Sequence, residues 1–144
     1  MDERKKYPTG RAGLIGLCLL CLAAVYIYQR ENYFAFLFPG VDHPHVAFAF
    51  NKTLRLLVND LLCMVLIVAI FRERKYLRVA FGVFLFELFL LLPLYLWIKL
   101  RWEGDSEISS PLLSPVHRLI INPMLMLILM VGFYYQKFLN RKTP

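Results

Sequence analysis

Four long runs of apolar residues constrain this chain more than any other feature of its sequence. They cover residues 12–29, 54–71, 79–98 and 116–135. A helix of about 20 apolar residues is long enough to cross the hydrocarbon of a bilayer. Hydrophobic residues make up 59% of the 144 residues, which leaves too little polar surface for a soluble fold. The sequence therefore predicts one all-α membrane domain over residues 1–144, a four-helix bundle with external loops at 30–53 and 99–115.

The basic residues predict how this bundle is oriented. Most of the 17 lysines and arginines fall before the first run, between the second and third, or after the fourth: Arg4, Lys5, Lys6, Arg11, Arg72, Arg74, Lys75, Arg78, Lys137, Arg141 and Lys142. Cytoplasmic segments of membrane proteins carry such an excess. Both termini are therefore expected in the cytoplasm. The net charge of +7 reflects this topology, and without a basic stripe outside the membrane flanks we predict no nucleic-acid partner.

The first run and the cysteines both have two interpretations. A basic segment before an apolar run resembles a signal peptide, but the run is long and no small-residue cleavage site follows, so we expect an uncleaved span. Cys18 and Cys21 have the spacing of a redox pair. They lie in the cytoplasmic half of the span without an external pair to relay electrons. Together with Cys63, they are interpreted as apolar packing residues rather than as a disulfide framework.

Proline, glycine and capping residues predict the ends of the elements in the first external loop. The aromatic segment Tyr33 to Phe38 is expected to lie as a short piece on the outer interface and to stop at Pro39 and Gly40. Asp42 is expected to cap a helix that has Pro44 in its first turn. That cap would extend the second membrane helix outward to about Pro44.

Similar signals mark the second half of the chain. The short basic link over residues 72–78 predicts that the second and third helices are antiparallel neighbours. Pro93 is expected to kink the outer half of the third helix. Ser114 followed by Pro115 predicts a cap and a first-turn proline at the start of the fourth helix.

An arginine–asparagine pattern occurs twice, near the external ends of two runs. Arg55 precedes Asn59 by four residues, and Arg118 precedes Asn122 by the same spacing, so each pair projects from one helix face. Polar groups at the edge of hydrocarbon normally face protein or water. The pattern predicts a shared polar seam, to which the neighbouring Asp60 would also contribute. Chance recurrence of common helix-end residues is the alternative.

Glu87 lies deeper, near the expected centre of the bilayer. A carboxylate at this depth must be protonated, paired or in contact with water. Arg55 or Arg118 reaching inward is the expected partner. The alternative is that the arginines extend outward to the interface and a neutral Glu87 bonds to a neighbouring helix. Because the cytoplasmic half of the chain offers almost no polar groups, no transport pathway is expected.

The histidines do not predict a metal site or a catalytic site. His43, His45 and His117 are all external, and they are interpreted as loop residues at the interface rather than zinc ligands. No serine or cysteine stands beside an outward-facing histidine as a nucleophile. The sequence therefore predicts no cofactor, no metal, no catalytic residue and no small-molecule substrate. A small membrane enzyme that uses His117 and Arg118 remains an alternative.

Three motifs carry a resemblance to a known family. Arg55-Leu56-Leu57-Val58-Asn59, Arg118 with Asn122-Pro123, and Phe133-Tyr134-Tyr135-Gln136-Lys137 resemble the exosortase F-associated membrane proteins. These are small four-span bacterial proteins encoded beside the exosortase called F. The likeness extends from the Arg30-Glu31-Asn32 region to Lys137. The chain departs from the family pattern at Asn122, where the family typically has glutamine or a similar amide.

The resemblance implies a non-enzymatic accessory subunit in the bacterial inner membrane. Exosortases are thought to process C-terminal sorting tails with a cysteine, an arginine and a histidine, a set that this chain lacks. The chain would bind the exosortase or present its substrates, surrounded by membrane lipid. The residues expected to form its partner contact or internal polar network are Arg55, Asn59, Asp60, Glu87, His117, Arg118 and Asn122. The other alternative is a structural subunit of a larger envelope complex.

Overall fold

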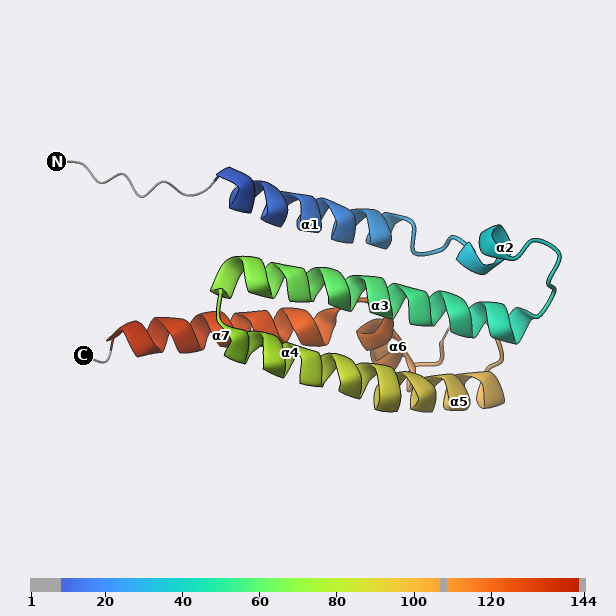
Figure 1. Ribbon diagram of the computed structural model, residues 1–144. Coiled ribbons are helices and arrows are strands. Elements are labelled where there is room, and N and C mark those ends of the chain that lie inside the picture. Colours follow the sequence, from blue (N-terminus) through green and yellow to red (C-terminus); the bar gives the residue numbers. More distant parts are fainter. Residues whose placement is uncertain (1–8, 107–108, 143–144) are drawn as a thin grey trace.

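The protein is entirely helical over the residues that the computed structural model describes, 9–106 and 109–142 (Figure 1). Its elements are α1 (Thr9–Ile27), α2 (Tyr33–Leu37), α3 (Pro44–Phe71), α4 (Arg74–Phe86), η1 (Glu87–Leu91), α5 (Leu92–Trp102), α6 (Ser114–Ile121) and α7 (Met124–Lys142). Because α4, η1 and α5 run on without interruption, the described residues form six separate helices. The basic residues Arg4, Lys5 and Lys6 and the acidic Glu107 lie outside the described residues, as do the side chains of Arg141 and Lys142.

Three of the described helices are long and apolar enough to cross a membrane. They are α1 over Gly10–Ile27, α3, and the continuous helix Arg74–Trp102. The pair α6 and α7 adds a fourth span if the two helices are counted together. The all-helical class is therefore confirmed, the three or four candidate spans indicate a multi-pass membrane protein, and the fourth span differs from the expected one.

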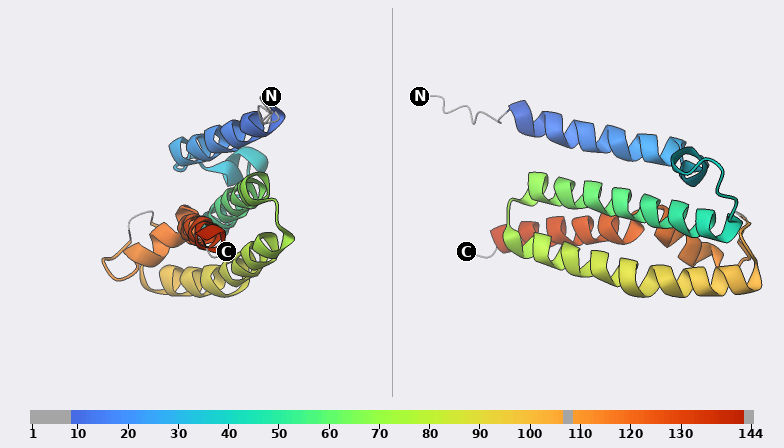
Figure 2. Two further views of the ribbon diagram at one scale, coloured as in Figure 1. Left: turned by 90° about the vertical axis from the view of Figure 1, so that its left-hand side faces the viewer. Right: turned by 45° about the vertical axis from the view of Figure 1, so that its right-hand side comes forward.

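Helix α3 lies at the centre of the bundle (Figures 1 and 2). Helix α1 packs along one flank of α3, and the α4–α5 helix and α7 pack on the opposite side. The described ends of α1 and α7 lie at the same end of the bundle, which we call the terminal end, and the opposite end is called the loop end. The antiparallel arrangement of α3 and α4 is as expected, but their link is only Arg72 and Glu73, because α4 already begins at Arg74.

An arginine of α1 closes the last turn of α3 at the terminal end. Arg11 donates from Nε to the carbonyl of Ala69 and from Nη2 to the carbonyl of Ile70, the latter at 2.8 Å. Arg72 follows the helix in the left-handed conformation, with φ of 60°, and its N–H bonds to the Val68 carbonyl at 3.2 Å. These donors satisfy carbonyls that a helix C-terminus leaves without intrahelical partners.

Helix α2 and the start of α3 follow the predicted pattern with one correction. The aromatic segment forms the short helix α2, capped by the Asn32 side chain, which accepts from the N–H of Ala35 at 3.3 Å. Helix α3 begins at Pro44, as expected, but its cap residue is His43 and Asp42 does not cap it. Because Pro44 is itself the first helical residue, the cap position falls on the residue directly before it.

The start of α6 needs the same correction. Ser114 is its first helical residue rather than its cap, and the cap position belongs to Leu113. Pro115 still lies in the first turn, where its missing N–H costs no hydrogen bond.

A π-helical turn, η1, lies just before Pro93, where a kink was expected. The N–H of Leu92 bonds to the carbonyl of Glu87, five residues back. Proline has no N–H, and its ring crowds the carbonyl four residues before it. The wider turn accommodates this crowding, and the helical residues continue to Trp102.

The same turn keeps one face of the long helix directed at α3. Buried residues recur every three or four positions on both sides of the turn, and a single step of five lies between Glu87 and Leu92: Tyr76, Ala80, Phe84, Glu87, Leu92, Tyr95 and Lys99. Glu87 therefore lies at a type of helical turn that is frequent at functional sites.

The fourth apolar run is not one straight helix, which corrects the expected span over residues 116–135. It breaks between α6 and α7, and the two helices meet at an angle of 71°. Asn122 at the break is extended, with φ of −107° and ψ of 142°. A residue before proline is disfavoured in the helical conformation, and Pro123 supplies no N–H to the preceding turn.

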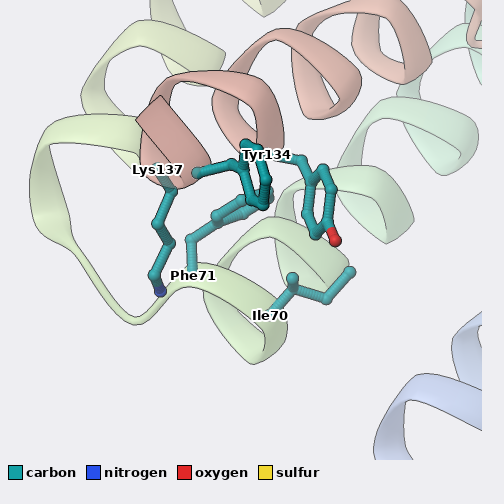
Figure 3. Close-up of a pocket in the computed structure, with 5 residues that line it drawn as sticks. Ile70, Phe71, Tyr134 and Lys137 are labelled. Carbon is teal, nitrogen blue, oxygen red and sulfur yellow. The ribbon is translucent and has the colours of Figure 1, made fainter. Parts of the chain in front are cut away.

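Aromatic side chains pack the terminal end of the bundle. Phe71 of α3, Tyr76 of α4 and Phe133 of α7 are buried and form a mutual cluster, with Tyr76 and Phe133 centroids 4.5 Å apart. We call these three residues the aromatic cluster. Figure 3 shows the adjoining pocket, where Tyr134 and Lys137 of α7 lie beside Ile70 and Phe71 of α3.

Candidate functional site

The buried polar side chains lie between the middle of the bundle and its loop end. Helix α3 contributes most of them, and the facing long helix contributes two. We call this set the polar half: Asn51, Lys52, Arg55, Asn59, Asp60, Glu87 and Lys99. Buried polar groups in protein interiors are normally hydrogen-bonded, so the partners of each member indicate what it does.

Asn51 and Arg55 hold the segment after α1 against α3. Asn51 accepts from the N–H of Phe34 at 3.0 Å and donates to the side chain of Asn32 at 2.8 Å. Arg55, with 3% of its surface exposed, donates from Nη2 to the Glu31 carbonyl at 3.2 Å. Sequence reasoning missed Asn51, although it precedes Arg55 by the same spacing that separates Arg55 from Asn59.

Asn59 joins α3 to the broken helix. Its Nδ2 donates to the carbonyl of Ile121 at 2.8 Å. In a continuous helix that carbonyl would accept from the N–H of Leu125, and the break at Pro123 releases it. The Asn59 amide therefore supplies the donor that the interrupted backbone needs.

Cavities lie on both sides of this break. One, of about 340 Å³, is lined by α1, by Arg55 and Asn59, and by the segment Ile121–Pro123. The other, of about 460 Å³, is lined by Pro111, Ser114, Pro115, Arg118, Leu119 and Met124. Irregular backbone at membrane depth is tolerated where it is buried in protein or lines a cavity.

The two arginine–asparagine pairs do not form one seam as expected. Asn59 bonds directly beside Asn122, but Arg55 is buried whereas Arg118 is exposed. The reason is that α6 diverges from α7 at the break, so similar depth does not place the two arginines on facing surfaces. Arg118 lies on the surface of α6, at the 460 Å³ cavity.

Glu87 faces Asp60 rather than an arginine. Their exposed fractions are 1% and 2%, and each carboxyl group acts electrostatically on the other. Neither oxygen of Glu87, nor Oδ2 of Asp60, has a hydrogen-bond partner among the described residues. The predicted pairing of Glu87 with Arg55 or Arg118 is therefore wrong.

A second group of polar contacts closes the loop end. Lys99 donates to Glu103 at 2.5 Å, and the N–H of Ser110 donates to the other Glu103 oxygen at 2.9 Å. The hydrogen bond from Lys99 is the largest cause that lowers the pKa of Glu103 from 4.5 to about 2. His117 is half-buried, and its Nδ1 contacts the hydroxyl of Tyr95. These contacts give His117 a packing position rather than that of an open loop residue.

The structure also places the two remaining histidines and the three cysteines. His43 and His45 are exposed, and all three cysteines are free thiols. Within residues 9–106 and 109–142, no three histidine, cysteine, aspartate or glutamate side chains are placed to hold a metal ion.

The motif near the end of the chain divides between core and surface. Phe133 belongs to the aromatic cluster, whereas Tyr134 is exposed and Lys137 lies 5.8 Å from the Phe71 ring centroid (Figure 3). The pocket beside them has a volume of about 180 Å³.

Comparisons with known proteins return no relative from which a function could be transferred. No family model, curated protein or solved structure matches the chain.

Proposed function

We propose that this chain is a non-enzymatic subunit of a membrane complex and that its partner is an exosortase in the bacterial inner membrane. The proposal combines a multi-pass helical fold with the three motifs that resemble exosortase F-associated proteins. Since no family model matches, the identity of the partner rests on those motifs alone. The alternative role is that of a structural subunit in a different envelope complex.

The proposal also assigns an orientation. The terminal end carries the exposed cations Arg72, Arg74, Lys75 and Arg78, together with Arg11 and Lys137. By the excess of positive charge in cytoplasmic segments, this end lies in the cytoplasm and the polar half lies toward the outer leaflet.

The exposed position of Arg118 is the structural observation that best supports the proposal. It is exposed on α6, at a cavity that prolines and apolar side chains line on the outer side of the helix break. Lipid tails offer such a guanidinium group no partner, so a charged side chain here faces water, headgroups or another protein. Arg55 and Asn59 have internal hydrogen bonds instead, and we assign them to holding the bundle together.

A pull-down from the native host with matched variants tests this division of roles. The tagged wild type and Arg118→Ala would be purified in mild detergent, with Arg78→Ala as the control, because Arg78 is also exposed but lies at the terminal end. We expect mass spectrometry to find an exosortase in stoichiometric amounts with the wild type and the control. With Arg118→Ala we expect at least a tenfold loss at unchanged abundance, equivalent to about 1.4 kcal/mol.

Two results would contradict the proposal. A wild-type preparation without an exosortase would remove the assigned partner, and a different stoichiometric assembly would favour the structural alternative. Full retention of the exosortase by Arg118→Ala would mean that the Arg118 surface is not the contact.

A further inference from the structure

The carboxyl groups of Asp60 and Glu87 form a buried pair that the proposed function does not use. Asp60 lies on α3, and Glu87 lies at the first position of the π-helical turn η1 on the facing helix. The side chains are almost completely buried, and each acts on the other. The pair therefore bridges the two longest helices near the middle of the bundle.

The two facing carboxyl groups require a hydrogen-bond donor between them. Ionised carboxylates have acceptor oxygens only, so two of them cannot hydrogen-bond to each other. Both oxygens of Glu87 and Oδ2 of Asp60 are buried without a hydrogen-bond partner among the described residues. Adding one proton turns one oxygen into an O–H donor and lets the two groups share a hydrogen bond.

No described cation neutralises the pair. Each carboxyl group is affected by its own burial and by the other carboxyl group. The nearest cation along α3, Arg55, donates to the Glu31 carbonyl, and Lys99 of the long helix binds Glu103. Two facing negative charges in a buried site repel each other and lose their hydration, and losing one of them removes most of that penalty.

The other titratable groups around the pair are equally unsuited to balance its charge. The Cys63 thiol of α3 interacts electrostatically with both carboxyl groups of the pair and with the Cys18 thiol of α1. His117 of α6 contacts Tyr95, and Arg118 is exposed at the surface. On α7, the described titratable side chains are Tyr134, Tyr135 and Lys137, which lie toward the terminal end.

We propose that Asp60 and Glu87 form a proton-binding site that holds one shared proton and links α3 to the π-helical turn. A proton from the aqueous solution binds one carboxylate oxygen of the pair, and the resulting O–H group donates a hydrogen bond to the facing carboxylate. The net charge of the site changes from −2 to −1, and no other reactant is needed. Closure of the bundle at mid-depth thereby depends on proton concentration.

Thermal unfolding of the full chain in detergent micelles tests the site. Because the folded pair holds a proton that the unfolded chain releases, stability should decrease as pH rises. We expect the wild-type midpoint to fall by roughly 5 °C between about pH 6 and about pH 9. Asp60→Asn and Glu87→Gln each replace one carboxyl group by a permanent amide donor, so each should reduce this fall, and the double variant Asp60→Asn/Glu87→Gln should abolish it.

Matched controls separate the pair from other carboxyl groups. Asp105→Asn changes an exposed carboxyl group outside the helices and should retain the wild-type pH dependence. Infrared spectra of the wild type should contain a protonated-carboxyl band near neutral pH that disappears at high pH and is lost in the double variant Asp60→Asn/Glu87→Gln. This spectroscopic test does not require the single variants to fold.

Three outcomes would overturn the site. They are a wild-type midpoint that does not vary with pH, a pH dependence that survives in the double variant Asp60→Asn/Glu87→Gln, and a midpoint that depends on sodium or potassium rather than on pH. None of these measurements involves a partner, so the proton site can fail while the exosortase proposal stands, and the reverse also holds.

Discussion

The two ends of the bundle are held together by different chemistry. At the terminal end, the aromatic cluster packs by shape, with ring centroids 4.5 to 5.8 Å apart. In the polar half, amide and charged side chains bond to specific backbone N–H and carbonyl groups of other segments. Within a bilayer, lipid tails are as apolar as leucine, so packing and interhelical hydrogen bonds drive helix association. The comparison indicates that the aromatic end supplies contact area, whereas the polar half determines which residues face each other.

The aromatic end should show the largest response to truncation. Phe133→Ala removes the ring that contacts both Phe71 and Tyr76 and leaves a cavity. We expect a loss of roughly 3 kcal/mol in the free energy of unfolding, measured by reversible denaturation in detergent. Tyr134→Ala, at an exposed neighbouring position, is the control and should have little effect. An equal loss in both variants would mean that the cluster has no special role.

The polar half should show a smaller but more specific response. Asn59→Leu preserves approximate size and removes the donor to the Ile121 carbonyl. A broken interhelical hydrogen bond in a membrane protein costs about 1–2 kcal/mol. We also expect spin-label distances between α6 and α7 to broaden, because the break loses its bond to α3. Unchanged stability together with unchanged distances would show that Asn59 does not hold the break.

Acid should weaken the contacts at the loop end. The folded-state pKa of Glu103 is lowered to about 2 by its hydrogen bond with Lys99, so its contribution is complete above its ordinary value of 4.5. That contribution is lost as the pH falls toward 2. Glu103→Gln should therefore reduce the fall of the unfolding midpoint over this range. An identical acid response in the variant and the wild type would exclude Glu103 as the source.

The smallest effect is expected on the outer face of α1. Leu20 is 70% exposed, so Leu20→Ala should change the free energy of unfolding by less than about 0.5 kcal/mol. The measurement is the same detergent denaturation. A loss comparable to that of Phe133→Ala would break the comparison, because it would mean that this face of α1 is covered in solution.

The sequence was sufficient for features that depend on local chemistry. Apolar length predicted the spans, and Pro44 and the Tyr33 segment marked real helix starts. The fourth run was misjudged because a proline in an apolar segment is compatible with either a kink or a break. The carbonyl freed at this break bonds to Asn59, a residue on another helix.

The partners of the polar groups also required the tertiary structure. Sequence spacing predicted a depth for Glu87 but could not predict the direction in which its side chain points. That direction depends on how the long helix is rotated against α3, which places Asp60 opposite Glu87. Arg118 matched Arg55 in sequence pattern, yet the bend between α6 and α7 separates their surfaces.

The π-helical turn has a consequence for how this protein can vary in length. Its step of five residues between Glu87 and Leu92 is one longer than an α-helical turn requires to return to the same face. Deleting one residue among Leu88–Leu91 would restore the four-residue step and leave Tyr95 and Lys99 directed toward α3, but it would also restore the crowding by Pro93 that the wider turn relieves. Homologues without the turn should therefore show a one-residue gap at this point in an alignment, and elsewhere in the helix a single deletion would rotate all following side chains away from the core.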